Sequence, residues 1–195
     1  MLRSSNIQKE VFLSQIAILL KENISKRKLK EDSLHFIYDY LDDVKDWTFF
    51  ETKLFNNIMS LIPFDKRKLY FQKFRSFSHR NVDLALINVE ISNWQSYIYL
   101  NHIQLLLYEN RFNDAKKCVE SMELDKSEFF TNERNELAFL LLSTLIKLYD
   151  PVERKAALEK LEYILKLVKI LNKTNWLLYT QIKEIHEERS KLNFH

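Results

Sequence analysis

The feature that most restricts this 195-residue chain is the complete lack of glycine, where average usage of about 7% would give about 14. Glycine adopts positive φ without a steric penalty, so tight hairpins, β-bulges and phosphate-binding loops depend on it. Its absence argues against a β-rich fold and against a nucleotide-binding α/β fold. With 46% hydrophobic and 29% charged residues, the rest of the composition is typical of a helical protein. We therefore predict an all-α fold.

The stretch from Ser92 to Leu124 predicts two helices folded back on each other across a polar corner at 109–111. Phe112 follows the corner and the small Ala115 comes three positions later, which is typical of the second helix in tetratricopeptide-like pairs. Apolar residues on the first helix form two neighbouring stripes, so we expect it to be covered on two sides. One stripe holds Trp94, Ile98, Leu105 and Tyr108, and the other holds Tyr97, Leu100, Ile103 and Leu107.

Capping residues and prolines delimit the other predicted helices. Capping boxes at Ser5/Gln8 and Thr48/Glu51 begin two of them, and Pro63 ends the second. In the first half of the chain, we predict that helices start at Asp32 and Asp83, that Asp65 is the N-cap of a helix over Lys66–His79, and that a break occurs at Ser92–Asn93. In the second half, we predict an apolar helix from Thr131 to Tyr149. Asp150 is then the predicted N-cap of a helix with Pro151 at its first position, and Thr174 is the predicted N-cap of the last helix.

These boundaries give about nine helices in antiparallel pairs, which is the pattern of an α-solenoid. No linker or low-complexity segment interrupts the chain. We therefore predict that residues 1–195 form a single helical-repeat domain.

The titratable residues form no catalytic or metal-binding motif. The five histidines are scattered, no His-Glu-x-x-His occurs, and Cys118 has no second thiol with which to bind a metal. Adjacent acids such as Asp42 and Asp43 point to different sides of a helix and are expected to be solvated or to act as caps. We predict no enzyme activity, no metal and no cofactor.

The single cysteine and the first residues of the chain indicate the cellular compartment in which the protein is expected. Cys118 cannot form an internal disulfide, which suits a reducing cytoplasm, and we expect it to be buried in a helix. Met1 to Lys9 is polar, and the apolar stretch from Ile16 to Leu20 is too short to span a bilayer. We expect a cytoplasmic protein without a membrane segment.

Basic and aromatic residues are interleaved from Lys66 to Arg80, and two interpretations remain open. Such a stretch can follow phosphates and stack on bases, or its aromatics can face the core beneath a basic outer face. The helical spacing of the aromatics and a net charge of only +3 favour the second interpretation. The basic residues are Lys66, Arg67, Lys68, Lys73, Arg75 and Arg80, and the aromatics are Tyr70, Phe71, Phe74 and Phe77.

Several short segments follow one another in a specific order: Tyr40–Leu41, Trp47, Phe50–Glu51, Leu54–Asn57, Leu86–Asn88, Arg111–Lys117, Asn132–Leu142, Ala157–Leu161 and Ile170–Leu171. In order and spacing they resemble the C-terminal regulatory domain of the Rgg/GadR/MutR family of transcriptional regulators from Gram-positive bacteria, over about Leu34 to Glu188. The resemblance implies a tetratricopeptide-like domain that binds a short hydrophobic signalling peptide on its concave face and usually dimerises.

Members of that family carry a helix-turn-helix domain ahead of this region. Here about 30 residues precede Leu34, and they predict one amphipathic helix. The chain is then either the sensing part without its DNA reader or a truncated relative that no longer binds DNA. In both cases we expect no direct DNA contact by this chain.

A peptide groove requires polar side chains within apolar surroundings. Asparagine can donate to and accept from a peptide backbone, arginine can hold a carboxylate, and large aromatics provide contact area. The alternative is that these asparagines cap neighbouring helices or bond to each other in the core. The candidate peptide-binding residues are Asn57, Arg75, Asn88, Trp94, Tyr97, Asn101 and Asn135.

The leading hypothesis is therefore a peptide-sensing, quorum-sensing regulatory domain. The alternative is a helical-repeat scaffold that binds another protein and no small ligand. Because a stack of helices must cover its ends, and because Trp176, Leu177 and Tyr179 point in successive directions, we also predict a homodimer through a terminal helix face.

Overall fold

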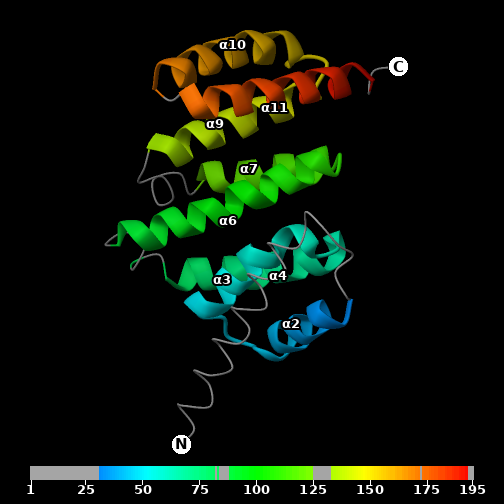
Figure 1. Ribbon diagram of the computed structural model, residues 1–195, viewed down its shortest axis with the longest axis vertical. Coiled ribbons are helices and arrows are strands. Elements are labelled where there is room, and N and C mark those ends of the chain that lie inside the picture. Colours follow the sequence, from blue (N-terminus) through cyan, green and yellow to red (C-terminus); the bar gives the residue numbers. More distant parts are fainter. Residues whose placement is uncertain (1–30, 82, 84–87, 125–132, 172, 193–195) are drawn as a thin grey trace, which may run out of the picture. The chain divides into compact units, whose positions relative to one another are not determined.

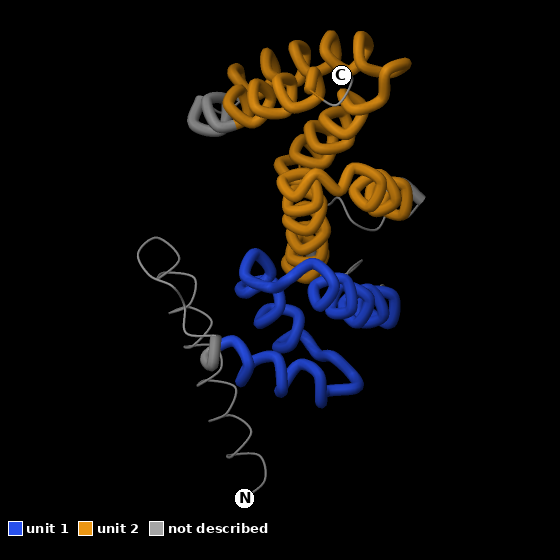
Figure 2. The backbone as a smooth tube through the Cα atoms, turned by 90° about the vertical axis from the view of Figure 1, so that its right-hand side faces the viewer, with its two compact units in different colours: residues 1–82 blue, residues 83–195 orange. Residues whose placement is uncertain are grey.

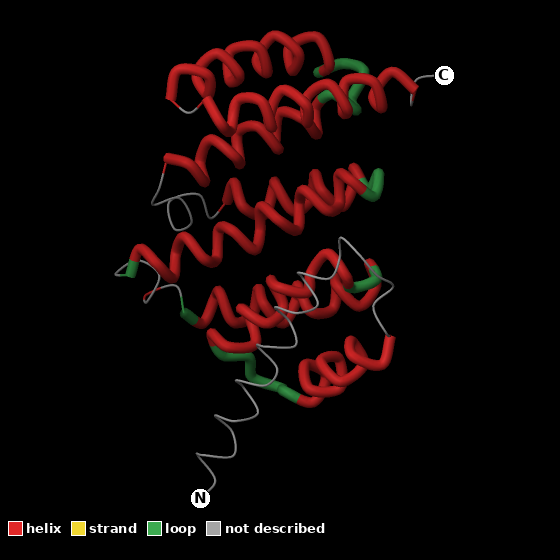
Figure 3. The backbone as a smooth tube through the Cα atoms, viewed as in Figure 1, coloured by secondary structure: helices red, strands yellow, loops and turns green. Residues whose placement is uncertain are grey.

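The computed structural model describes residues 31–81, 83, 88–124, 133–171 and 173–192, and within them all regular structure is helical (Figures 1 and 3). The prediction of an all-α fold is thereby confirmed for the described part of the chain. The predictions for Ser5/Gln8, for the start of the 131–149 helix and for 84–87 lie outside these residues. The helices are α2 (Glu31–Asp43), α3 (Phe49–Ile58), the 3-10 helix η1 (Met59–Leu61), α4 (Phe64–Arg80), α6 (Val89–Tyr108), α7 (Phe112–Leu124), α9 (Glu133–Lys147), α10 (Arg154–Leu171) and α11 (Lys173–Leu192).

The chain divides into two compact units, residues 1–82 and residues 83–195 (Figure 2). The first unit contains α2 to α4, and the second contains α6 to α11. The predictions of a single domain and of a solenoid over the whole chain stay predictions. None of the described helices is long and apolar enough to cross a membrane.

In the first unit, the predicted capping box starts α3 and is confirmed. The Thr48 hydroxyl accepts a hydrogen bond from the Phe50 N–H, and the Glu51 carboxylate accepts from the Thr48 N–H at 2.7 Å. Two orphan donors of the first turn are thus satisfied. Pro63, rather than Asp65, is the N-cap of α4, and Asp65 lies within its first turn. The prediction for Asp65 was wrong because the proline already fixes the start of the helix two residues earlier.

The aromatic residues of α4 face the core, as the second interpretation predicted. Tyr70 and Phe74 are fully buried and Phe77 nearly so. Trp47, from the connection before α3, packs within 5.8 Å of the Tyr70 ring, measured between ring centroids. Arg67 differs from the expected basic outer face, since it is only 1% exposed and its guanidinium donates to the Ile62 carbonyl. These aromatics are therefore not available for stacking on bases.

Three cations of α4, spaced seven residues apart, reach the connection between α2 and α3. The Lys66 ammonium pairs with the Asp42 carboxylate at 2.8 Å, and the Arg80 guanidinium pairs with Asp46. The Lys73 ammonium donates to the backbone carbonyls of Leu41, Asp42 and Val44, at 2.7, 3.1 and 3.1 Å. A cation here satisfies carbonyls that the end of α2 leaves without helical partners.

Asp42 is the acidic partner in this arrangement. Burial opposes its ionisation, but hydrogen bonds from Lys66 and Tyr70, and the charges of Lys66 and Lys73, lower the pKa of its carboxyl. The same contact and burial raise the pKa of the Tyr70 hydroxyl. The seven-residue spacing of basic residues on α4 thus places them against the end of α2 and the connection that follows it.

In the second unit, α6 is one continuous helix. Asn88 is its N-cap and accepts from the N–H groups of Glu90 and Ile91. The predicted break at Ser92–Asn93 was wrong because Ser92 continues the helical hydrogen bonding: its N–H bonds to the Asn88 carbonyl at 3.1 Å, and its carbonyl accepts from the Ser96 hydroxyl.

The corner between α6 and α7 lies where the sequence predicts it. Asn110 has φ of 60°, and it is the one residue at positive φ among those described. The Arg111 N–H bonds to the Leu106 carbonyl and the Asn110 N–H bonds to the Leu107 carbonyl, which together form a Schellman motif. Asparagine occupies the left-handed position that glycine usually takes, which is how a chain without glycine ends this helix tightly.

Burial along α6 and α7 follows most of the predicted pattern. Residues of both stripes and of α7 are buried, whereas Tyr97 and Tyr108 were expected to be covered and are 42% and 70% exposed. Tyr108 lies in the last turn of α6, beneath the guanidinium of Arg189 at 5.4 Å. The buried residues of this hairpin include Ile98, Leu100, Ile103, Leu107, Ala115 and, as predicted, Cys118.

Neighbouring helices of the second unit pack in sequence: α6 on α7 and α9, α9 on α10, and α10 on α11. Asp150 caps the turn after α9 by accepting from the Val152 N–H, and α10 begins at Arg154. The predicted start at Pro151 was thus three residues early, because a turn intervenes. Thr174 lies inside α11 and is not its N-cap. The buried face of α10 is confirmed at Ala157, Leu161, Ile164 and Val168.

Candidate ligand site

A cavity of about 250 Å³ lies among α6, α9 and α11, three helices of the second unit. Its α6 wall consists of residues at spacings of three, four and seven, so these side chains share one face of the helix. On α9, the lining residues Asn135, Ala138 and Leu142 are separated by three and four positions, so they also share one face. The lining residues are Tyr97, Leu100, Asn101 and Gln104 on α6, Arg134, Asn135, Ala138, Leu141 and Leu142 on α9, and Tyr179 and Ile182 on α11.

Three amide side chains, Asn101, Gln104 and Asn135, line the cavity together with leucines that form its apolar floor. Asn135 is 2% exposed, and its Nδ2 lies 3.4 Å from Oδ1 of Asn93, which joins the start of α9 to α6. Leu141 and Leu142 are buried beneath it. Arg134 supplies the single charge among the eleven lining residues. Burial raises the pKa of the Tyr179 hydroxyl, and the charge of Arg134 opposes that shift.

A hydrogen-bonded pair, the half-buried Tyr149 and the buried His186, holds α11 to the end of α9. The Tyr149 hydroxyl lies 2.6 Å from Nδ1 of His186, and Phe112 stacks on the Tyr149 ring with centroids 3.5 Å apart. Burial and the nearby Arg189 charge lower the pKa of His186 to about 4. Burial raises the pKa of Tyr149 to about 12, against the opposing charge of Arg189. The pair is therefore neutral at pH 7 and fixes the helix that forms the third wall.

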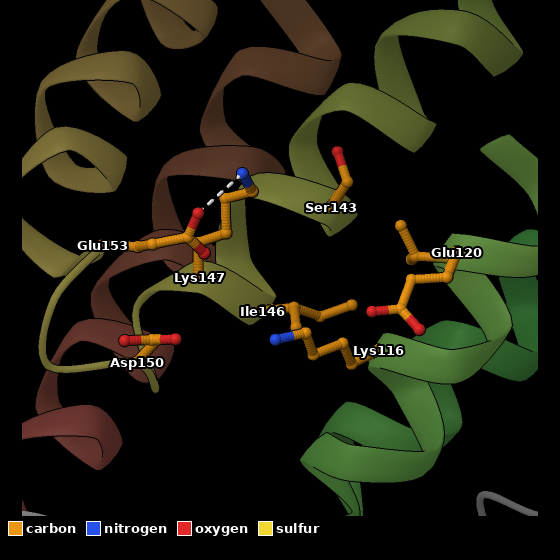
Figure 4. A pocket seen from close by; sticks show the side chains of 8 residues that line it. Lys116, Glu120, Ser143, Ile146, Lys147, Asp150 and Glu153 are labelled. Carbon is orange, nitrogen blue, oxygen red and sulfur yellow. Dashed lines mark hydrogen bonds and ion pairs between the residues drawn. The ribbon is translucent and has the colours of Figure 1, made fainter.

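A second cavity, of about 370 Å³, lies between α7, α9 and the turn after α9 (Figure 4). Lys116 and Glu120 project from α7, and the Lys147 ammonium pairs with Glu153 at 3.1 Å. Charged residues of both signs line this second cavity, and it has no group of leucines like the one that lines the first cavity. Among the residues that the structure describes, no group of three or more His, Cys, Asp or Glu side chains could hold a metal ion.

The structure brings three of the seven candidate residues together in the first cavity: Tyr97, Asn101 and Asn135. Asn57 and Arg75 lie half-buried on α3 and α4 in the first unit. Asn88 caps α6, and Trp94 lies half-buried on α6 without lining the cavity.

Sequence reasoning missed several residues of the cavity. Gln104 could have been found, since it lies three residues after Asn101 and shares its helix face. Arg134, Ala138 and Tyr179 carry no such signal, because their place depends on how α9 and α11 pack against α6.

Comparison with known protein families identifies the chain. A family model described as the C-terminal domain of the HTH-type transcriptional regulator Rgg matches residues 1–183. The chain belongs to the Rgg family. The resemblance carried by the short segments between Tyr40 and Leu171 is thus confirmed. This Rgg domain is part of a family of transcriptional regulators, and a search of curated proteins gives no match.

One solved structure has a related fold. The Rgg domain is similar to the crystal structure of a candidate transcriptional regulator from Listeria monocytogenes EGD-e, with a TM-score of 0.76 and 15% sequence identity. The match covers 94% of this chain and 63% of the Listeria chain. At this identity the likeness shows the fold alone, and it agrees with the all-α prediction.

Proposed function

We propose that this Rgg domain is the peptide-sensing part of a transcriptional regulator and that the cavity among α6, α9 and α11 anchors a short hydrophobic peptide. The observation that carries the proposal is the composition of that cavity. Leucines form its floor, while Asn101, Gln104 and Asn135 lie among them. Amide side chains can pair with both the N–H and the carbonyl groups of a peptide, as peptide recognition requires.

The size of the cavity limits what it can hold. At about 250 Å³ it is smaller than the 300–1,000 Å³ typical of pockets for drug-sized ligands. It therefore suits one or two side chains of a peptide, and the remaining residues would lie along the exposed edge at Tyr97. Burying about 150–250 Å² of one aromatic side chain would contribute about 4–6 kcal/mol before the ordering cost is subtracted.

The first test is a calorimetric titration of the full chain with short hydrophobic peptides encoded near its gene, and with scrambled peptides as controls. We expect saturable binding at micromolar concentration or below, and we expect Asn101→Ala to weaken it about tenfold by removing a half-buried hydrogen-bonding partner. Asn113→Ala, at an exposed position of α7, is the matched control and should leave the affinity unchanged. Failure of every peptide to bind would refute the proposal and favour the protein-binding scaffold.

We further infer that the domain forms a homodimer through the outer face of α10. Tyr163, Leu167 and Ile170 are 68%, 50% and 81% exposed, and their spacing of four and three places them on one stripe. An antiparallel pair of α10 helices centred near Leu167 would cover both copies of this exposed apolar stripe.

Leu167→Glu is expected to shift the protein from dimer to monomer at tens of micromolar, because it places two like charges near the two-fold axis. Analytical ultracentrifugation measures this directly. Val152→Glu, at a position that is 90% exposed in the turn before α10, introduces the same charge away from the stripe and should leave the dimer intact. A wild-type monomer at these concentrations would contradict the inference.

In this proposal the domain acts in the cytoplasm and performs no catalysis. Its place in a family of transcriptional regulators supports a regulatory role, and DNA would be read by another part of the regulator or by a partner. The burial of the α4 aromatics supports the absence of direct DNA contact at 66–80.

A further inference from the structure

The residues that line the cavity among α6, α9 and α11 carry charge of one sign only. Arg134 is its single charged lining residue, and no carboxylate lines it. Arg134 is exposed, and the ion pairs between described residues do not include it. By contrast, Lys66, Arg80, Lys147 and Lys183 each pair with an acid. Among the described residues, the cavity therefore presents a positive charge without a paired acid at the edge of an apolar floor.

The neighbouring acids of α9 do not line the cavity. Glu133 and Glu136 lie in the same first turn as Arg134, but both are exposed and neither lines the cavity. Residues that face Arg134 from the other walls are neutral: Tyr97, Asn101 and Gln104 on α6, and Tyr179 and Ile182 on α11. An anionic group placed here would meet one guanidinium and several neutral hydrogen-bonding side chains.

We propose that Arg134 binds the free C-terminal carboxylate of the peptide, whose last side chain then fills the apolar floor at Leu100, Leu141 and Leu142. The planar guanidinium holds a carboxylate through two parallel N–H···O bonds, which fixes its orientation as well as its charge. This inference rests on the proposed function and specifies the orientation of the bound peptide: its C-terminal end lies at Arg134.

A carboxylate attached to an apolar group could also belong to a free fatty acid. The amides favour the peptide, since Asn101, Gln104 and Asn135 offer donors and acceptors that an alkyl chain cannot use. The two sources can be separated experimentally.

The test uses three probes with the full chain: N-acetyl-Leu-Leu-Phe as the free acid, the same peptide as its C-terminal amide, and octanoate. Ligand-observed NMR titrations give the affinities. We expect the acid to bind about tenfold or more tightly than the amide, and Arg134→Gln to remove that difference while leaving the amide unaffected. Lys117→Gln, an equal loss of charge at an exposed position of α7, should preserve the difference.

Each result has a distinct meaning. Equal binding of acid and amide, no binding of the acid, or a preference for the acid that survives in Arg134→Gln would overturn this inference. Octanoate binding as tightly as the peptide acid would overturn the assignment to a peptide C-terminus. None of these results by itself refutes the proposed function, which is tested by the longer peptides and by Asn101→Ala.

Discussion

Lowering the pH from 7 to 5 is expected to reduce the free energy of unfolding of the second unit by about 2 kcal/mol through His186 alone. The ring is buried, and its pKa is lowered from 6.5 to about 4 by burial first and by the charge of Arg189 second. Its folded-state pKa lies below its unfolded-state value, so the unfolded chain binds the extra proton first as the pH falls. The stabilising contribution is therefore complete above about pH 6.5 and is lost progressively down to about pH 4.

Urea unfolding at pH 7, 6 and 5 measures this loss. The chain has three tryptophans, at 47, 94 and 176, so a Trp47→Phe background restricts the fluorescence signal to the second unit. His186→Gln is the control, since glutamine can still bond to Tyr149 but cannot take up a proton in this pH range. The variant should lose much less stability than the parent between pH 7 and pH 5. Parallel pH profiles for the two proteins would show that His186 is not the group that titrates.

Replacing Lys73 by methionine is expected to destabilise the first unit by about 2 kcal/mol. The ammonium group satisfies three backbone carbonyls where α2 ends and the connection to α3 begins. Methionine preserves much of the aliphatic stem but leaves these carbonyls without the charged donor. The ammonium also lies 6.0 Å from the centre of the Trp47 ring, and that contact would be lost as well.

Trp47 reports on this change directly when Trp94→Phe and Trp176→Phe remove the signal of the second unit. Lys68→Met is the matched control, because Lys68 is exposed on the same helix. We expect it to change the stability by less than about 0.5 kcal/mol. If the two substitutions shift the urea midpoint of Trp47 fluorescence equally, the Lys73 contacts do not stabilise the unit as described.

Local sequence patterns predicted the helices because apolar periodicity and caps act over a few residues. The capping box of Thr48 and Glu51 and the corner at 109–111 were found in this way. The same reasoning misplaced Asp65 and Thr174, since a residue suited to capping also fits inside a first turn when a neighbour has already begun the helix.

Contacts between helices could be predicted only in part. The seven-residue spacing of Lys66, Lys73 and Arg80 indicated one face of α4, but it carried no information on the α2–α3 connection that this face meets. The residues of the candidate ligand site could likewise be predicted only in part. Tyr97 and Asn101 share a face of α6 by their spacing, whereas Arg134 resembles any surface cation until α11 and α6 are placed around it.

The left-handed backbone conformation of Asn110 restricts which residues can replace it. Only glycine, asparagine and, less readily, aspartate adopt this conformation without substantial strain, so few substitutions are tolerated at this corner. A mutational scan would therefore report Asn110 as sensitive although it lines neither cavity. Its sensitivity would reflect the backbone of the hairpin, and only a binding measurement on a folded Asn110→Gly variant could distinguish that constraint from a role in ligand recognition.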